Sequence, residues 1–171
     1  MSPSAFPSIS ILSVASLACL FILLGVAVYF DLRFRRIPNG LSLLVALASV
    51  PYWAGVSGLS MPASLGQQFL ILLIALAPLL LLFAVGALGG GDVKLLGALL
   101  LWARAGDVLE MIAIIILAGG VVAVGAVVHA LWKGRKPSDA TVPFGVAIAA
   151  GAMPILTGDL LVNLKELGLL G

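Results

Sequence analysis

Two aspartates, Asp31 and Asp92, are the residues best suited to carry chemistry in a chain that has only seven acidic side chains. Asp92 directly follows three glycines in the stretch LGGGDVKLLG (88–97), and Asp31 begins the stretch DLRFRRIPNG (31–40). If the fold brings the two carboxyl groups to within about 3 Å, they cannot both ionise and must share one proton. One group then takes a proton from water while the other protonates a carbonyl oxygen, which is general acid–base hydrolysis of a peptide bond.

The positions of the two aspartates predict different roles. Glycine lets the backbone bend, so Asp92 is expected where a helix begins, with the helix dipole lowering its pKa. Asp31 is expected at a helix C-terminus, where the dipole disfavours a negative charge. This predicts Asp92 as the resting base and Asp31 as the acid. As an alternative, Asp92 is only a helix cap and Asp31 only part of a charged membrane anchor.

The elements that must position these residues are membrane helices. The chain is 63% hydrophobic and 9% charged, with a mean hydropathy of +1.28, whereas soluble domains are about a quarter charged. Residues 9–30 form a run of 22 residues without a charge, which is long enough to cross a hydrocarbon core of about 30 Å. Because residues 1–8 contain no Lys or Arg, we interpret this run as a retained helix rather than a cleaved signal peptide.

Further spans are predicted at residues 41–57, 67–88, 111–132 and 140–158. Between Lys94 and Arg104 only nine residues are uncharged, so a crossing there must begin near Gly90 and end near Gly106, with Asp92 at the membrane boundary. The sequence therefore predicts an all-α polytopic membrane protein with about six transmembrane helices, in a single domain of residues 1–171. The tail, residues 159–171, is expected to lie on the surface.

Six spans place seven basic residues on one side of the membrane and two on the other. The seven are Arg33, Arg35, Arg36, Lys94, Lys133, Arg135 and Lys136, and the two are Arg104 and Lys165. This bias predicts termini outside the cytoplasm and both aspartates at the cytoplasmic face. Aromatic residues at the span ends are expected to lie at the membrane interfaces, and glycines such as Gly86 and Gly90 to allow close helix packing. These aromatic residues are Tyr29, Phe30, Tyr52, Trp53, Trp102 and Trp132.

Several classes of site find no support in the sequence. The single cysteine, Cys19, excludes an internal disulfide and a Cys-rich zinc site, and it is expected to be a buried apolar residue. The one histidine, His129, has no Ser or Cys nucleophile in a recognised motif, and we assign it no catalytic role. No basic run is interleaved with aromatic residues, so nucleic acid is not an expected partner. No cofactor and no metal are implied.

The motifs resemble those of a known family. GGGD (89–92) fits the GxGD signature of intramembrane aspartyl proteases, DLRFRRIPN (31–39) resembles the first-aspartate motif of type IV prepilin peptidases, and VPFGVAIAAG (142–151) resembles their last-helix segment. The resemblance implies Asp31 and Asp92 as the catalytic pair and a loop shaped by Gly89 and Gly91. It also implies structural or substrate-positioning roles for Arg36, Pro38, Asn39, Lys94, Pro143 and Gly145.

This resemblance implies a bacterial inner-membrane enzyme that cuts the short basic leader from prepilins or pseudopilins, just before their hydrophobic stretch, on the cytoplasmic side. Larger members carry paired cysteines in a domain associated with methylation of the new N-terminus. With one cysteine, this chain is expected to lack methyltransferase activity and resembles the short members that serve Flp/Tad-type pili. The alternatives are a presenilin-like GxGD protease, which Phe30 and VPFG argue against, a proton-coupled transporter that uses both aspartates as a relay, and a non-catalytic scaffold.

Overall fold

Six α-helices and no strands make up the part of the chain that the computed structural model describes, residues 7–57, 61–86, 88–136 and 142–169. These helices are α1 (Pro7–Phe34), α2 (Asn39–Ser57), α3 (Met61–Ala84), α4 (Gly90–Leu100), α5 (Val108–Trp132) and α6 (Phe144–Glu166). The predicted all-α class is confirmed.

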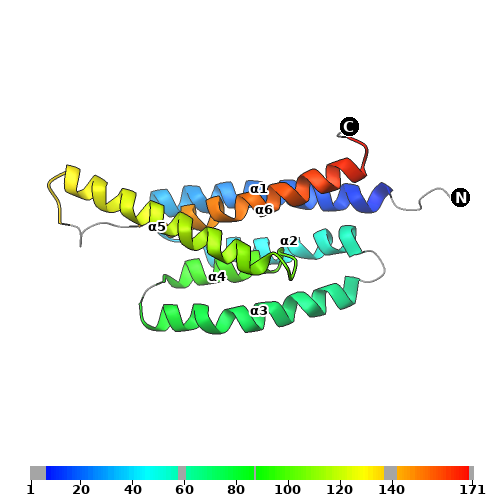
Figure 1. The fold of residues 1–171 in the computed structure, drawn as a ribbon, viewed down its shortest axis with the longest axis horizontal. Coiled ribbons are helices and arrows are strands. Elements are labelled where there is room, and N and C mark those ends of the chain that lie inside the picture. Colours follow the sequence, from blue (N-terminus) through cyan, green and yellow to red (C-terminus); the bar gives the residue numbers. More distant parts are fainter. Residues whose placement is uncertain (1–6, 58–60, 87, 137–141, 170–171) are drawn as a thin grey trace, which may run out of the picture.

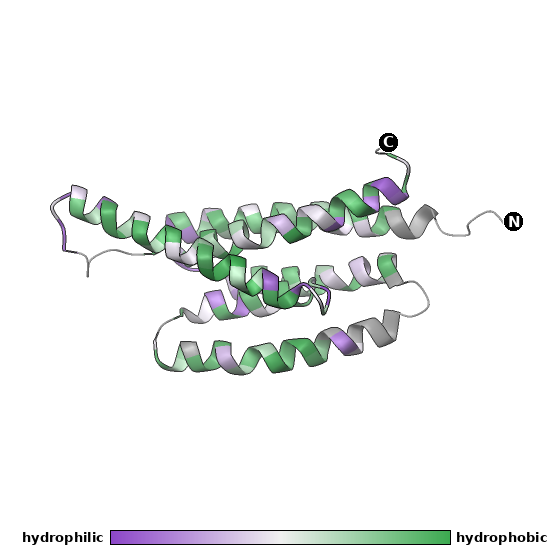
Figure 2. Cartoon of the chain, in the orientation of Figure 1, coloured by the Kyte–Doolittle hydropathy of each residue, from purple (hydrophilic) through white to green (hydrophobic). Residues whose placement is uncertain are grey.

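Four of the helices, α1, α2, α5 and α6, are long and apolar enough to cross a membrane. Large apolar side chains are exposed on these helices and on α3: Leu109 and Val121 of α5 and Ile74 of α3 are each more than 70% exposed. Hydrophobic residues colour the helices along their lengths, while hydrophilic residues gather mainly near helix ends (Figure 2). Such continuous apolar surface suits lipid rather than water. The chain is therefore a polytopic membrane protein, as its composition predicted.

The helices lie roughly side by side along the long axis of the molecule (Figure 1). α1 packs against α2 and α6, α5 packs against α6, and α4 contacts α2, α3 and α6. α1 begins and α6 ends at one end of the bundle, whereas the α1–α2 and α3–α4 turns lie at the other end (Figure 1). The two sequence segments that carry Asp31 and Asp92 thus meet at the same end of the molecule.

Helix α4 is shorter than the sequence predicted. We expected a crossing from about Gly90 to about Gly106, but the helix ends at Leu100 and a turn follows. Its eleven residues extend about 16 Å, roughly half of the hydrocarbon core. One end of α4 is therefore inside the bundle rather than at a membrane surface.

Aromatic side chains hold that inner end of α4. The indole N–H of Trp102 donates to the Val45 carbonyl at 2.9 Å, and the indole N–H of Trp53 donates to the Leu101 carbonyl at 2.7 Å. Trp53, Trp102 and Tyr52 are buried in the protein, so they do not form the lipid-facing aromatic belt that the sequence suggested. They lie inside because the short α4 leaves backbone groups within the bundle, and in lipid such groups need partners.

Three further expectations are corrected by the structure. Residues 159–166 continue α6 instead of forming a surface tail, and Asp159 is buried. Cys19 is exposed on α1 rather than buried. Gly86 lies outside the helices, and a Cβ atom added to it would have no neighbour within 4 Å. Gly151 of α6, in contrast, lies so close to α5 that an added Cβ would stand 2.5 Å from the Ile115 Cα. Close packing by glycine therefore occurs between α5 and α6.

Candidate active site

Asp31 lies in the last turn of α1 and is 5% exposed. Its carboxylate accepts a hydrogen bond from the backbone N–H of Val146, at the start of α6, with a distance of 3.3 Å. α6 comes this close because Gly145 has no side chain: a Cβ there would lie 3.0 Å from Asp31 Oδ2 and 3.1 Å from its Cβ and Cγ. The VPFG segment therefore forms the wall behind the first aspartate.

Asp92 lies in the first turn of α4, which begins after the extended N-cap residue Gly89. Its carboxylate turns back toward this cap residue. The approach is so close that a Cβ on Gly89 would stand only 2.9 Å from Asp92 Oδ2. Gly91 lies against the α1–α2 turn, where a Cβ would be 3.3 Å from the Ile37 Cβ. The glycines thus allow two close approaches, one to the aspartate itself and one to the turn that follows Asp31.

Both aspartates line one cavity of about 400 Å³ at the end of the bundle that holds the α1–α2 and α3–α4 turns. The cavity has a mixed lining: two carboxyl groups and two guanidinium-bearing residues stand among glycine backbone and two aliphatic side chains. Its lining residues are Asp31, Arg35, Arg36, Ile37, Gly89, Gly90, Gly91, Asp92 and Val142. Such a cavity can admit an extended peptide and water together.

Burial and the negative charge of Asp31 raise the pKa of Asp92 to about 6, and a hydrogen bond from the Gly89 backbone opposes this rise in part. Asp92 belongs to α4, which at eleven residues is too short to cross a membrane. The prediction that the helix dipole lowers this pKa is wrong, because the loss of water and the neighbouring charge outweigh the dipole. Asp92 consequently holds its proton up to about pH 6, well above the pH at which an ordinary aspartate ionises.

Two predicted site residues pair with each other rather than line the cavity. The ammonium group of Lys94 donates to Asn39 Oδ1 at 2.9 Å, which joins the start of α2 to the first turns of α4. Pro38 lies in the α1–α2 turn, and its carbonyl accepts the N–H groups of Leu41 and Ser42. Pro143 precedes α6 as its N-cap. These residues fix the backbone around the cavity.

Sequence reasoning missed Arg35 and Val146. Arg35 lines the cavity and adopts a left-handed conformation, with φ of 53°. This conformation ends α1, since the Arg35 N–H donates to the carbonyl of Asp31. Glycine or asparagine usually occupies such a position, so an arginine gave no signal. Val146 acts through its backbone, which no side-chain motif records.

Among the described residues, no group of three or more His, Cys, Asp and Glu side chains could hold a metal ion. The polar lining of the cavity consists of two aspartates, two arginines and the backbone of three glycines.

Comparison with known proteins gave one match. No similar protein of curated function and no similar solved structure was found. The model of the Type IV leader peptidase family matches residues 18–124. That range includes both aspartates and the glycines before Asp92, while the VPFG segment lies beyond it. Because the match spans well over half of the chain, the protein belongs to the type IV leader peptidase family, as its motifs predicted.

Proposed function

We propose that the protein is an aspartyl endopeptidase that removes leader peptides from Flp/Tad-type prepilins at the cytoplasmic boundary of the bacterial inner membrane. The observation that supports this most directly is that Asp31 and Asp92 line one cavity, although 61 positions separate them in the sequence. Family membership supports the peptidase activity. The prepilin substrate, the dyad and the orientation are our inference.

In the proposed mechanism, Asp92 is the acid and Asp31 is the base. Asp31 accepts the Val146 N–H, which orients its carboxylate, and the negative charge of Asp31 helps to raise the pKa of Asp92. Asp31 takes a proton from water as the oxygen attacks the scissile carbonyl carbon, and Asp92 gives its proton to the carbonyl oxygen. Collapse of the tetrahedral intermediate breaks the C–N bond, and the amine leaves with the proton that Asp31 acquired.

This assignment reverses the roles expected from the helix dipole alone. The dyad ends the cycle with the single proton that it began with, because one hydroxyl proton of the gem-diol intermediate returns to Asp92 as the carboxylic acid product forms. Neither step needs a covalent bond between enzyme and substrate.

The test is cleavage of a co-expressed prepilin by the wild type, Asp31→Asn and Asp92→Asn, with the membrane abundance of each variant measured. Both variants should lose cleavage by at least about 10³-fold, since neither half of the dyad works alone. Asp107→Asn is the matched control, because Asp107 precedes α5 and does not line the cavity. Normal cleavage by either dyad variant would remove that aspartate from the mechanism. Inactivity of the wild type toward every prepilin tested would favour a proton relay.

A further inference from the structure

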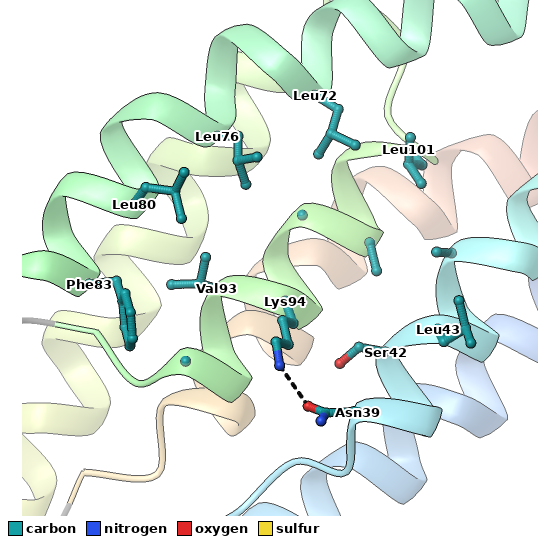
Figure 3. A pocket seen from close by; sticks show the side chains of 14 residues that line it. Asn39, Ser42, Leu43, Leu72, Leu76, Leu80, Phe83, Val93, Lys94 and Leu101 are labelled. Carbon is teal, nitrogen blue, oxygen red and sulfur yellow. Dashed lines mark hydrogen bonds between the residues drawn. The ribbon is translucent and has the colours of Figure 1, made fainter.

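A second cavity, the lateral groove, lies beside the cavity that Asp31 and Asp92 line, here called the Asp31–Asp92 cavity. The lateral groove has the larger volume of the two. It has a volume of about 680 Å³ and is enclosed by α2, α3 and α4. Leu72, Leu76, Leu80 and Phe83 of α3 point across it toward α4 and α2 (Figure 3). These residues recur on one face of α3, and the facing walls are also mainly apolar. The lining is completed by Asn39, Ser42, Leu43, Ala46, Gly90, Val93, Lys94, Gly97, Ala98 and Leu101.

One end of the lateral groove carries hydrogen-bonding side chains. Lys94 and Asn39 meet there at 2.9 Å, and the Ser42 hydroxyl lies nearby (Figure 3). Ser42 is 6% exposed, and its hydroxyl has no hydrogen-bond partner among the described residues. An unpaired hydroxyl inside an apolar groove is costly unless a ligand satisfies it. This end therefore suits a ligand that presents polar backbone groups.

The lateral groove adjoins the Asp31–Asp92 cavity at Gly90. Gly90 lines both spaces, so the boundary between them is a residue without a side chain. A Cβ at Gly90 would stand 3.3 Å from the Phe83 ring and would narrow the space where the groove adjoins the cavity. Asn39, at the polar end of the groove, follows directly on the turn that contains the cavity residues Arg36 and Ile37.

We propose that the lateral groove binds the apolar segment of the substrate that adjoins the scissile peptide bond. This proposal rests on the proposed function and adds where the substrate lies. Leucine side chains of α3 pack against the apolar segment. Where that segment must unwind to reach the dyad, Ser42, Asn39 and Lys94 bind its freed backbone groups, which lipid cannot do. The peptide bond then crosses Gly90 and lies between Asp31 and Asp92.

Kinetics with a reconstituted prepilin test this proposal through a matched pair of variants on one helix. Leu76→Trp fills the lateral groove, whereas Leu73→Trp adds the same ring to an exposed position of α3 outside it. We expect KM to rise about tenfold or more for Leu76→Trp, with kcat little changed, and neither to change for Leu73→Trp. Ala46→Leu, on the facing wall of α2, should act like Leu76→Trp. Equal KM values for all four proteins would overturn the proposal.

Photocrosslinking tests the contact between the lateral groove and the apolar substrate segment, and it does not require cleavage. A photoreactive residue replaces Leu76 or Leu73 in the Asp31→Asn background, and prepilin in lipid vesicles is added. Position 76 should crosslink to the apolar segment of the prepilin at least about tenfold more than position 73. Crosslinks from position 76 to lipid alone would show that lipid fills the groove and would overturn the proposal. Because this readout needs only binding, it separates failure of the groove from failure of the proposed protease activity.

Discussion

Gly145 is the single residue on which the position of Asp31 depends most closely. A Cβ at Gly145 would lie 3.0 Å from Asp31 Oδ2, so Gly145→Ala must displace the carboxylate or push α6 away from α1. We expect cleavage to fall about 100-fold, the usual effect of a misplacement near 1 Å. Gly158→Ala, in the same helix with no neighbour within 4 Å, should keep wild-type activity. Prepilin cleavage at equal membrane abundance measures both variants, and an active Gly145→Ala would contradict the proposed wall behind Asp31.

The raised pKa of Asp92 predicts a pH dependence with a definite sign. Burial and Asp31 raise this pKa to about 6, so Asp92 holds its proton below that pH and loses it above. If Asp92 is the acid, kcat/KM declines as the pH rises through about 6, because kcat/KM reports the pKa values of the free enzyme. The reverse assignment, with Asp92 as the base, predicts a rise over the same interval. A pH–rate profile with reconstituted enzyme distinguishes the two.

Removal of the Asp31 charge offers a direct check on the cause of that shift. In Asp31→Asn the coulombic contribution disappears while burial remains, so the pKa of Asp92 should fall but stay above its ordinary value. Infrared titration of the protonated carboxyl band in lipid vesicles follows this group. An unchanged midpoint would show that the two aspartates are not electrostatically coupled.

At the scale of elements, α4 is held from the end opposite Asp92. Arg104 follows the helix and forms an ion pair with Asp159 of α6 at 3.3 Å, and the Tyr52 hydroxyl of α2 donates to the same carboxylate at 3.2 Å. These contacts join three segments at the inner end of a helix that is too short to reach both membrane surfaces. The end of α4 that carries Asp92 therefore depends on polar contacts far from the Asp31–Asp92 cavity.

These contacts predict that Asp159→Ala lowers the free energy of unfolding more than Tyr52→Phe does. Tyr52→Phe removes one hydrogen bond to a carboxylate and should cost about 1 to 2 kcal/mol. Asp159→Ala leaves both the Tyr52 hydroxyl and Arg104 without this partner and should cost more, although the exposure of Arg104 limits the ion-pair contribution. Thermal unfolding in nanodiscs measures both against Glu166→Gln, at an exposed position of α6. Equal midpoints for Asp159→Ala and Glu166→Gln would show that the contacts do not hold α4.

The sequence predicted some helices well and the end of another wrongly, and both outcomes have physical reasons. Long charge-free runs mark helices such as α1 and α5, because lipid excludes charges over a whole span. The same reasoning failed where charges lie inside the bundle: Asp159 ended the predicted last span, yet α6 continues past it because Arg104 and Tyr52 satisfy its carboxylate. Partners that come from distant segments leave no local pattern in the sequence.

For the site, the sequence could predict the two aspartates and their glycines but not how they are held. The bend before Asp92 and the basic turn after Asp31 are local signals. The hydrogen bond that orients Asp31 comes from a backbone N–H 115 positions later. The direction in which the Asp92 pKa shifts depends mainly on burial. Both follow from the packing of helices, which hydropathy alone does not determine.

At the scale of the whole molecule, the fold fixes which segments share an end, and charge predicts which end faces the cytoplasm. α5 runs from the turn after α4 toward the end of the bundle that holds the α1–α2 and α3–α4 turns (Figure 1), and most basic residues lie in the turns at that end. In a Cys19→Ser background, Gly106→Cys should therefore react with a membrane-impermeant thiol reagent in intact cells, because a side chain at Gly106 meets no neighbour within 4 Å. Lys133→Cys, at an exposed position beyond α5, should react only after the membrane is permeabilised. The opposite pattern would place the Asp31–Asp92 cavity outside the cytoplasm, where a peptidase would meet a prepilin only after its leader had crossed the membrane.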